Sequence, residues 1–163
     1  MTIRVGLQAY PPDTGPAPDC TGMPGPLVMG LPLKASLQLG SPTVRSGEDF
    51  TATATVTNTS DAAVDFESGE PMMAYLYRPG TDQVVGAYVG GIGGVGAGQT
   101  LAPGESIDLD VVGGTASCLP DLGYALPPGQ YDVRAAIDQY ERPNGGFLVR
   151  YLLTAPATLT VTP

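Results

Sequence analysis

Residues 101–137 read LAPGESIDLDVVGGTASCLPDLGYALPPGQYDVRAAI, and this stretch decides the fold of the chain. Apolar and polar residues alternate in it twice, in IDLDV at 107–111 and in YDVRAAI at 131–137. A period of two residues is the pattern of a β-strand with one buried face and one solvated face. Each run follows a Pro-Gly pair, which supplies the backbone angles of a turn. The stretch therefore predicts two strands of a β-sandwich.

The rest of the chain repeats this pattern of short strands and turns. The clearest alternation is FTATATVT at 50–57, where the β-branched threonines suit the solvated face. A turn is predicted at 41–48 and a loop at 138–146, and no segment shows helical periodicity. We expect an all-β fold, an antiparallel β-sandwich of about seven to nine strands. The further predicted strands are 2–10, 33–39, 64–66, 72–78, 83–89, and 147–153 with 157–161, which count either as two strands or as one strand bent at Pro156.

Residues 11–32, PPDTGPAPDCTGMPGPLVMGLP, contain too much proline and glycine for regular structure. We therefore divide the chain into an N-terminal strand with a Pro/Gly-rich arm at 1–32 and a sandwich domain at 33–163. The arm ends in apolar residues, among them Leu27, Val28 and Leu31, which a solvated linker would not need. We expect the arm to lie on the sandwich.

The chain contains two cysteines, Cys20 in the arm and Cys118 between the two strands of the opening stretch. We expect them to form a disulfide; two unrelated thiols, or a metal-binding or catalytic role, are the alternatives. The bridge would close a loop of about 98 residues, worth roughly 4 to 5 kcal/mol if it acts through chain entropy. Disulfides persist in oxidising compartments, so we expect an extracellular or cell-surface protein. The first 20 residues lack the features of a signal peptide, which is expected to be absent from this chain.

Charge narrows the class of partner. Lys and Arg number 7 and Asp and Glu 16, for a formal net charge of −9. This charge repels nucleic-acid phosphates and anionic lipid headgroups. The sequence also lacks an apolar run of the length that spans a bilayer, so we expect no membrane insertion. A protein is the expected partner, and the oligomeric state stays open.

Catalytic chemistry is restricted because the chain contains no histidine. Ser-His-Asp and Cys-His arrangements and imidazole ligands for zinc are therefore excluded. Carboxylates occur in two sets with the oxygen chemistry of calcium sites, but outward carboxylates on strands are ordinarily just the solvated face. We expect no catalytic residue, no metal and no cofactor. The two carboxylate sets are Asp108 with Asp110, and Asp61 with Asp65, Glu67 and Glu70.

Two other patterns have a structural explanation. Gly91, Gly93 and Gly96 have the spacing of a dinucleotide-binding motif, but that motif needs a following helix and a turn is predicted instead. A flexible or closely packed glycine-rich strand is expected. Tyr75 and Tyr77 share one face of the predicted strand 72–78, where an exposed row would suit carbohydrate or peptide. We expect them to pack in the core.

Three blocks carry a family resemblance: FTATATVTNT at 50–59, LAPGES at 101–106 and LPPGQYDV at 126–133. With them, residues 33–163 resemble a bacterial immunoglobulin-like β-sandwich, and more narrowly the intracellular-proteinase-inhibitor-like domains. The resemblance implies protease inhibition through an exposed loop, with 113–126 and 138–146 as candidates. Gly129-x-Tyr131 resembles a tyrosine corner, in which the Tyr131 hydroxyl binds nearby backbone and stabilises the fold.

The sequence therefore supports three hypotheses on function. The first is a non-enzymatic immunoglobulin-like module for binding or structural display, outside the cytoplasm or on an assembled surface. Alternatives are a proteinase inhibitor that acts through an exposed loop and an accessory domain of an extracellular enzyme. The sandwich pattern, together with the missing catalytic groups, favours the first.

Overall fold

The computed structural model describes residues 20, 22–28, 31–90, 97–141, 143–146 and 148–163. The predicted strand at 2–10 lies outside these residues. The described chain is built almost entirely of β-strands, with two single-turn 3-10 helices at Pro120–Leu122 and Pro143–Gly145. The strands are β1 (Leu33–Leu39), β2 (Thr43–Arg45), β3 (Asp49–Asn58), β4 (Val64–Ser68), β5 (Met72–Tyr77), β6 (Val84–Ala87), β7 (Ala97–Leu101), β8 (Ser106–Gly114), β9 (Ala116–Ser117), β10 (Gly129–Glu141), β11 (Leu148–Leu153) and β12 (Ala157–Thr162).

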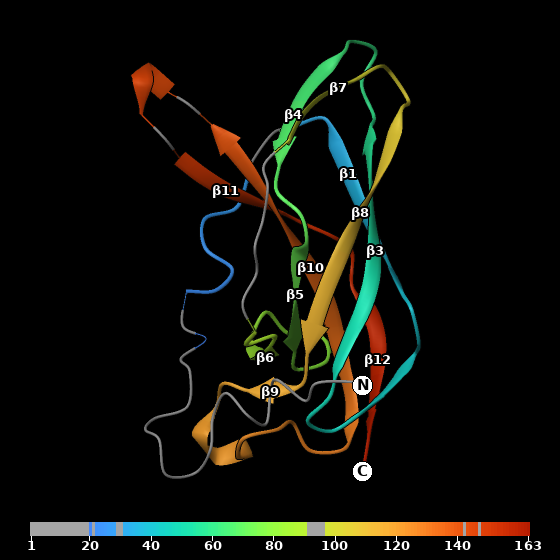
Figure 1. Ribbon diagram of the computed structural model, residues 1–163, viewed down its shortest axis with the longest axis vertical. Coiled ribbons are helices and arrows are strands. Elements are labelled where there is room, and N and C mark those ends of the chain that lie inside the picture. Colours follow the sequence, from blue (N-terminus) through green and yellow to red (C-terminus); the bar gives the residue numbers. More distant parts are fainter. Residues whose placement is uncertain (1–19, 21, 29–30, 91–96, 142, 147) are drawn as a thin grey trace.

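Ten of these strands belong to one hydrogen-bonded sheet, and β4 and β7 form a second, two-stranded sheet (Figure 1). The order in the larger sheet is β1-β3-β8-β5-β10-β12-β2, with β11 beside β10 and with β6 between β5 and β9. Most pairs are antiparallel, as expected, but β2 pairs β12 in parallel and β5 pairs β8 in parallel. The fold is an all-β sandwich, which the sequence predicts.

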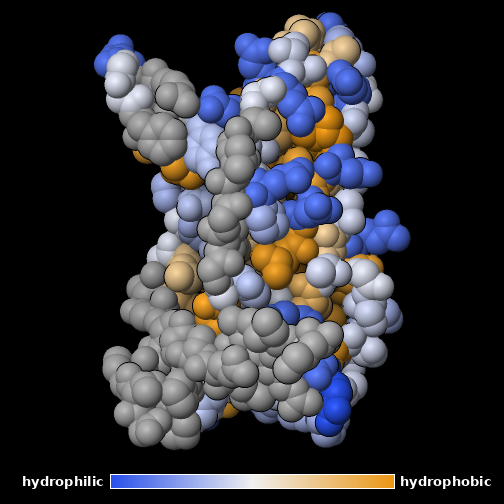
Figure 2. Space-filling model, viewed as in Figure 1, coloured by the Kyte–Doolittle hydropathy of each residue, from blue (hydrophilic) through white to orange (hydrophobic). Residues whose placement is uncertain are grey.

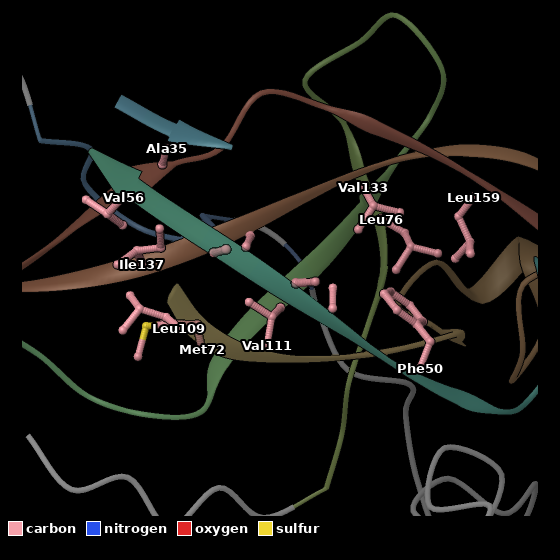
Figure 3. Close-up of a cluster of buried hydrophobic side chains, with 14 of the residues drawn as sticks. Ala35, Phe50, Val56, Met72, Leu76, Leu109, Val111, Val133, Ile137 and Leu159 are labelled. Atoms are coloured by element: carbon pink, nitrogen blue, oxygen red, sulfur yellow. The ribbon is translucent and has the colours of Figure 1, made fainter. Parts of the chain in front are cut away.

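A single main core lies inside the curved sheet. Strand β3 shows how the sequence builds it: Phe50, Ala52, Ala54 and Val56 are buried, whereas the threonines between them are exposed or half-buried. Side chains of β3, β5, β8 and β10 point toward one another in this core (Figure 3). The alternating apolar and polar residues of the sequence therefore lie on the inner and outer faces of the sheet.

Strand β5 contributes to two apolar clusters because it lies between β8 and β10 in the middle of the sheet. Met72 and Leu76 belong to the main core. Tyr75 and Tyr77, on the opposite face, are 7% and 2% exposed and form a second cluster with both cysteines. The tyrosines are thus packed, as expected, and do not form an exposed row.

Four segments differ from the prediction, and one of them is β9, which lies in the loop predicted between the two strands of the opening stretch. Strand β10 continues through Glu141 and pairs with β11, so the loop predicted at 138–146 is shorter. The residues after Ile137 are polar and lack an alternating pattern, but they form a strand because β11 supplies their hydrogen-bond partners. Strand β2 lies within the predicted turn at 41–48, where only Val44 is buried. Strand β7 carries exposed glycine and polar residues and therefore lacks an apolar pattern.

Within the described residues, no helix has the length and apolar character needed to cross a membrane.

Candidate binding cleft

A cleft of about 430 Å³ lies between the β4–β7 sheet and the outer half of β10. Asp65 to Glu67 of β4 and residues 98–100 of β7 line one side. Gln139 and Tyr140 of β10 line the other, and Leu31 joins them from the arm. The β10–β11 hairpin projects away from β4 and β7, and the hollow between them is visible at the upper left of Figure 2. The divergence of the β10–β11 hairpin from the β4–β7 sheet thus creates this cleft.

The divergence begins where β5 stops pairing with β10. The last pair of this ladder is Met73 with Ala136, and Pro71 stands two residues before Met73. Proline has no N–H to give to a ladder, so a proline at the start of a strand marks where pairing ends. The chain before Pro71 belongs to β4, which pairs with β7 in the second sheet. Strand β10 therefore leaves β5 and continues with β11 alone beside it.

Two hydrogen bonds join β10 to the end of β4 and the residue after it, at the point of divergence. The buried Gln139 side chain donates from Nε2 to the carbonyl oxygens of Glu67, at 3.3 Å, and of Asp138, at 3.2 Å. The Gly69 N–H donates to Oδ1 of Asp138 at 3.3 Å. These hydrogen bonds tie the end of β4 to β10 and fix one end of the cleft.

The cleft is electrostatically negative. Asp65 is exposed, and its Oδ1 accepts a hydrogen bond from Thr100 Oγ1 at 2.8 Å. The Tyr140 hydroxyl donates to Asp138 Oδ2 at 2.6 Å. This hydrogen bond, with burial and the nearby negative charges of Asp138 and Glu67, raises the pKa of Tyr140 to about 12. None of the described residues that line the cleft is a lysine or an arginine.

The structure contains the predicted disulfide between Cys20 and Cys118, with Cα atoms 5.5 Å apart. The described part of the arm also pairs with β11. Val28 N–H donates to the Tyr151 carbonyl oxygen at 2.8 Å, and Tyr151 N–H donates to the Pro26 carbonyl oxygen at 2.9 Å. These contacts place the described part of the arm on the sandwich, although Leu27 remains 43% exposed.

The other residues singled out from the sequence lie apart from the cleft. The Tyr131 hydroxyl donates to the Pro127 carbonyl oxygen at 2.7 Å, which is the backbone contact of a tyrosine corner. Asp108 and Asp110 are exposed on β8, where Asp108 accepts a hydrogen bond from Thr55. In the described parts of the chain, no three His, Cys, Asp or Glu residues come together as a metal site would require.

The cleft itself is only partly visible in the sequence. Asp65 and Glu67 belong to the carboxylate set noted there, but Asp61 and Glu70 do not line the cleft. Gln139 and Tyr140 fall in the predicted loop at 138–146, and Gln99 and Thr100 follow the glycine-rich stretch. The one feature of the sequence that could have indicated Gln139 and Tyr140 is that their polar run directly follows the apolar strand predicted at 131–137.

No protein-family model matches the sequence, and no curated protein matches it. Similar solved structures include a β-glucosidase from Erythrobacter marinus, which is 14% identical over 90% of this chain with a TM-score of 0.45. A β-glucosidase from Listeria innocua is 14% identical over 80% of this chain, with a TM-score of 0.41. The sporulation control protein Spo0M of Bacillus subtilis is 16% identical over 83%, with a TM-score of 0.39. This chain covers 19%, 16% and 51% of these three chains, and TM-scores this low support no inference on activity.

Proposed function

We propose that the protein is a non-enzymatic, immunoglobulin-like binding module that acts outside the cytoplasm and binds a protein partner in the cleft. The observation that carries this proposal is the cleft itself. It is open to solvent between the β4–β7 sheet and the β10–β11 hairpin, and polar side chains of three strands line it. Concave sites with a few convergent polar groups are the usual places for ligands.

The chemistry of the cleft favours binding over catalysis. Its described side chains offer carboxylates, amides and hydroxyls, and the whole chain contains no histidine. Both cysteines are held in the disulfide, so neither is available as a nucleophile. A nucleophile paired with an imidazole base therefore cannot form.

The disulfide supports a location outside the cytoplasm, since reducing systems in the cytoplasm keep thiols free. It joins residues separated by 98 positions and is buried at both ends, with Cys20 8% and Cys118 4% exposed. Such a bridge is typical of a structural disulfide in an exported domain. Cell-surface display is the setting that we propose.

Selection from a random-peptide display library on the immobilised full chain tests this function. Gly98→Tyr provides a blocked cleft, because a Cβ at Gly98 meets no atom within 4 Å and the new ring would occupy the opening. Ser36→Tyr, on the exposed side of β1, adds the same ring elsewhere. We expect peptides that bind the wild type and Ser36→Tyr but not Gly98→Tyr. Failure to enrich any peptide, or turnover of chromogenic glycosides by the wild type, would contradict the proposal.

Protease inhibition is the second candidate, and the β10–β11 hairpin is the observation that favours it. Its end is exposed at Asn144, Gly145 and Gly146 and projects from the sandwich (Figure 1). The other candidate loop is less suitable, because residues 113–118 are buried. Incubation with a subtilisin-like protease decides this question: lasting inhibition that Asn144→Pro removes would support the role, and simple cleavage would exclude it.

A further inference from the structure

We propose that a second site, on the face of β5, β10 and β11 that carries the second apolar cluster, binds the quaternary ammonium group of a small molecule. The site is a hollow of about 160 Å³. It shares no lining residue with the cleft, so this inference is independent of the proposed function. Three features carry it: the size of the hollow, its aromatic walls, and a carboxylate whose hydrogen-bond partners are neutral.

The register of three neighbouring strands creates the hollow. Met73 on β5 pairs with Ala136 on β10, and two residues further along β10, Asp138 pairs with Tyr151 on β11. Residues two apart on a strand share a face, and so do paired residues on neighbouring strands, so these four side chains stand on one surface. Ala136 is the shortest of them, and the longer side chains around it line the space above it.

The size of the hollow limits what it can hold. Pockets for drug-sized ligands measure about 300 to 1,000 Å³, whereas an apolar cavity of about 150 Å³ holds a molecule of the size of benzene. At about 160 Å³, the hollow therefore takes one compact group and leaves the rest of a larger ligand outside. A trimethylammonium group is compact and nearly spherical, and it fits this requirement.

The walls of the hollow suit a methylated cation. Tyr75 and Tyr151 line it together with Pro71 and Met73. Burial, and then the neighbouring Tyr151 and Tyr77, raise the pKa of Tyr75 to about 12, so the phenol groups of Tyr75 and Tyr151 lie near each other. Aromatic rings attract cations electrostatically, and pockets of aromatic side chains recognise quaternary ammonium groups. A primary ammonium group is strongly hydrated and would lose its water in such a pocket.

Asp138 supplies the negative charge that favours a cation. Its half-buried side chain lines the hollow. Its Oδ1 accepts a hydrogen bond from the Gly69 N–H at 3.3 Å, and its Oδ2 accepts one from the Tyr140 hydroxyl at 2.6 Å. Both donors are neutral, so they orient the carboxylate without cancelling its charge. Arg134 does not line the hollow, and its guanidinium is paired with Asp82 at 3.1 Å. A ligand with a carboxylate beside its ammonium group would be repelled by Asp138.

Titration of the isotope-labelled full chain with choline, followed by NMR, tests the site. We expect saturable amide shifts centred on Ala136, Asp138 and Tyr151. The neutral isostere of choline, in which a carbon atom replaces the nitrogen, should bind at least about tenfold more weakly, because it keeps the shape but lacks the attraction to the rings and the carboxylate. Glycine betaine has the same ammonium group with a carboxylate beside it and should also bind more weakly than choline.

Variants separate the parts of the site. Ala136→Leu fills the hollow and should abolish the shifts. Asp138→Asn keeps the shape of the side chain and should weaken choline binding about threefold or more, whereas Asp110→Asn, an equal charge change on exposed β8, should leave it unchanged. Tyr151→Phe keeps the ring and should bind choline as the wild type does, but Tyr151→Leu should bind it more weakly. Thermal melts check that each variant is folded.

Three results would overturn the proposal. The absence of any saturable shift with choline would remove the site, whether or not Ala136→Leu folds. Equal binding of choline and its neutral isostere would make the hollow a simple apolar pocket. Equal weakening by Asp138→Asn and Asp110→Asn would mean general attraction of a cation to an acidic protein. Peptide binding in the cleft is measured separately, so failure here leaves that function standing.

Discussion

The side-chain amide nitrogen of Gln139 on β10 lies 3.3 Å from the carbonyl oxygen of Glu67 on β4. This contact joins two sheets that share no backbone ladder in the described chain. It lies at the point where β10 leaves β5, and the cleft opens beside it. Gln139 therefore both joins β10 to β4 and lines the space between the β4–β7 sheet and the β10–β11 hairpin.

Loss of the disulfide should lower stability substantially. Cys20→Ser with Cys118→Ser removes a bridge over 98 residues, and native disulfides in small domains typically contribute about 2 to 5 kcal/mol, mostly by restricting the unfolded chain. Urea unfolding, followed by circular dichroism with and without a reducing agent, measures the loss. The double variant should not respond to the reducing agent. Two reactive thiols in the unfolded, non-reduced wild type would contradict the bridge.

The arm should stabilise the sandwich beyond the effect of the disulfide. Its backbone pairs with Tyr151, and a Cβ on Gly25 would lie 3.0 Å from the Tyr151 ring, so the two surfaces are in close contact. Deletion of residues 1–30 in a Cys118→Ser background should lower the melting temperature by roughly 2 to 4 °C for each 1 kcal/mol lost. The matched reference is the full chain with both cysteines replaced. Equal melting temperatures would show that the arm is only a tether.

Tyr131→Phe should destabilise the protein by about 1 kcal/mol, the usual net contribution of one hydrogen bond. The hydroxyl donates to the Pro127 carbonyl oxygen at 2.7 Å, and the ring itself is buried, so phenylalanine retains the packing. Tyr124→Phe, at a half-buried position, removes a hydroxyl elsewhere and serves as the control. If the free energies of unfolding of the two variants differ by less than about 0.3 kcal/mol, the hydrogen bond of Tyr131 does not contribute more to stability than an ordinary hydroxyl.

Alkaline pH should weaken the fold through Tyr75. Burial, reinforced by the neighbouring Tyr151 and Tyr77, raises the pKa of Tyr75 to about 12 from its ordinary value of 10.0. Between pH 10 and pH 12 the folded state keeps a proton on Tyr75 that the unfolded state releases. The stabilisation from this difference in pKa is therefore fully present below pH 10 and is lost as pH rises toward 12. The loss is roughly 1 to 2 kcal/mol. The free energy of unfolding, measured with urea at mildly and at strongly alkaline pH, should fall less for Tyr75→Phe than for the wild type. An equal fall in both proteins would show that Tyr75 is not the group responsible.

The sequence predicts those strands whose side chains alternate between core and solvent. Strand β1 is predicted with the bounds that it has, and β3 within one residue at each end, because Phe50 to Val56 contribute every second residue to the core. The pairing of Cys20 with Cys118 was also predictable, since no other cysteine competes. In these cases, local pattern and tertiary structure agree.

The cleft was not predictable from local pattern, because it depends on where strands part. Gln139 and Tyr140 lie in a polar run that reads as a loop, and only pairing with β11 makes it a strand. Pro71 ends the β5–β10 ladder, but its partner strand is 65 residues away from it at Ala136, and sequence alone does not reveal that pairing. Long-range pairing decides the site.

Amide chemical-shift mapping by NMR tests the central claim most directly. The isotope-labelled full chain is titrated with the peptide enriched by selection. We predict that the largest shifts fall on Asp65 and Thr100, which line one side of the cleft, and on Gln139, which lines the other, and that Gly98→Tyr abolishes them. Largest shifts at Ser36 on β1, or at Asn144 at the hairpin end, would contradict the assignment of the cleft as the binding site.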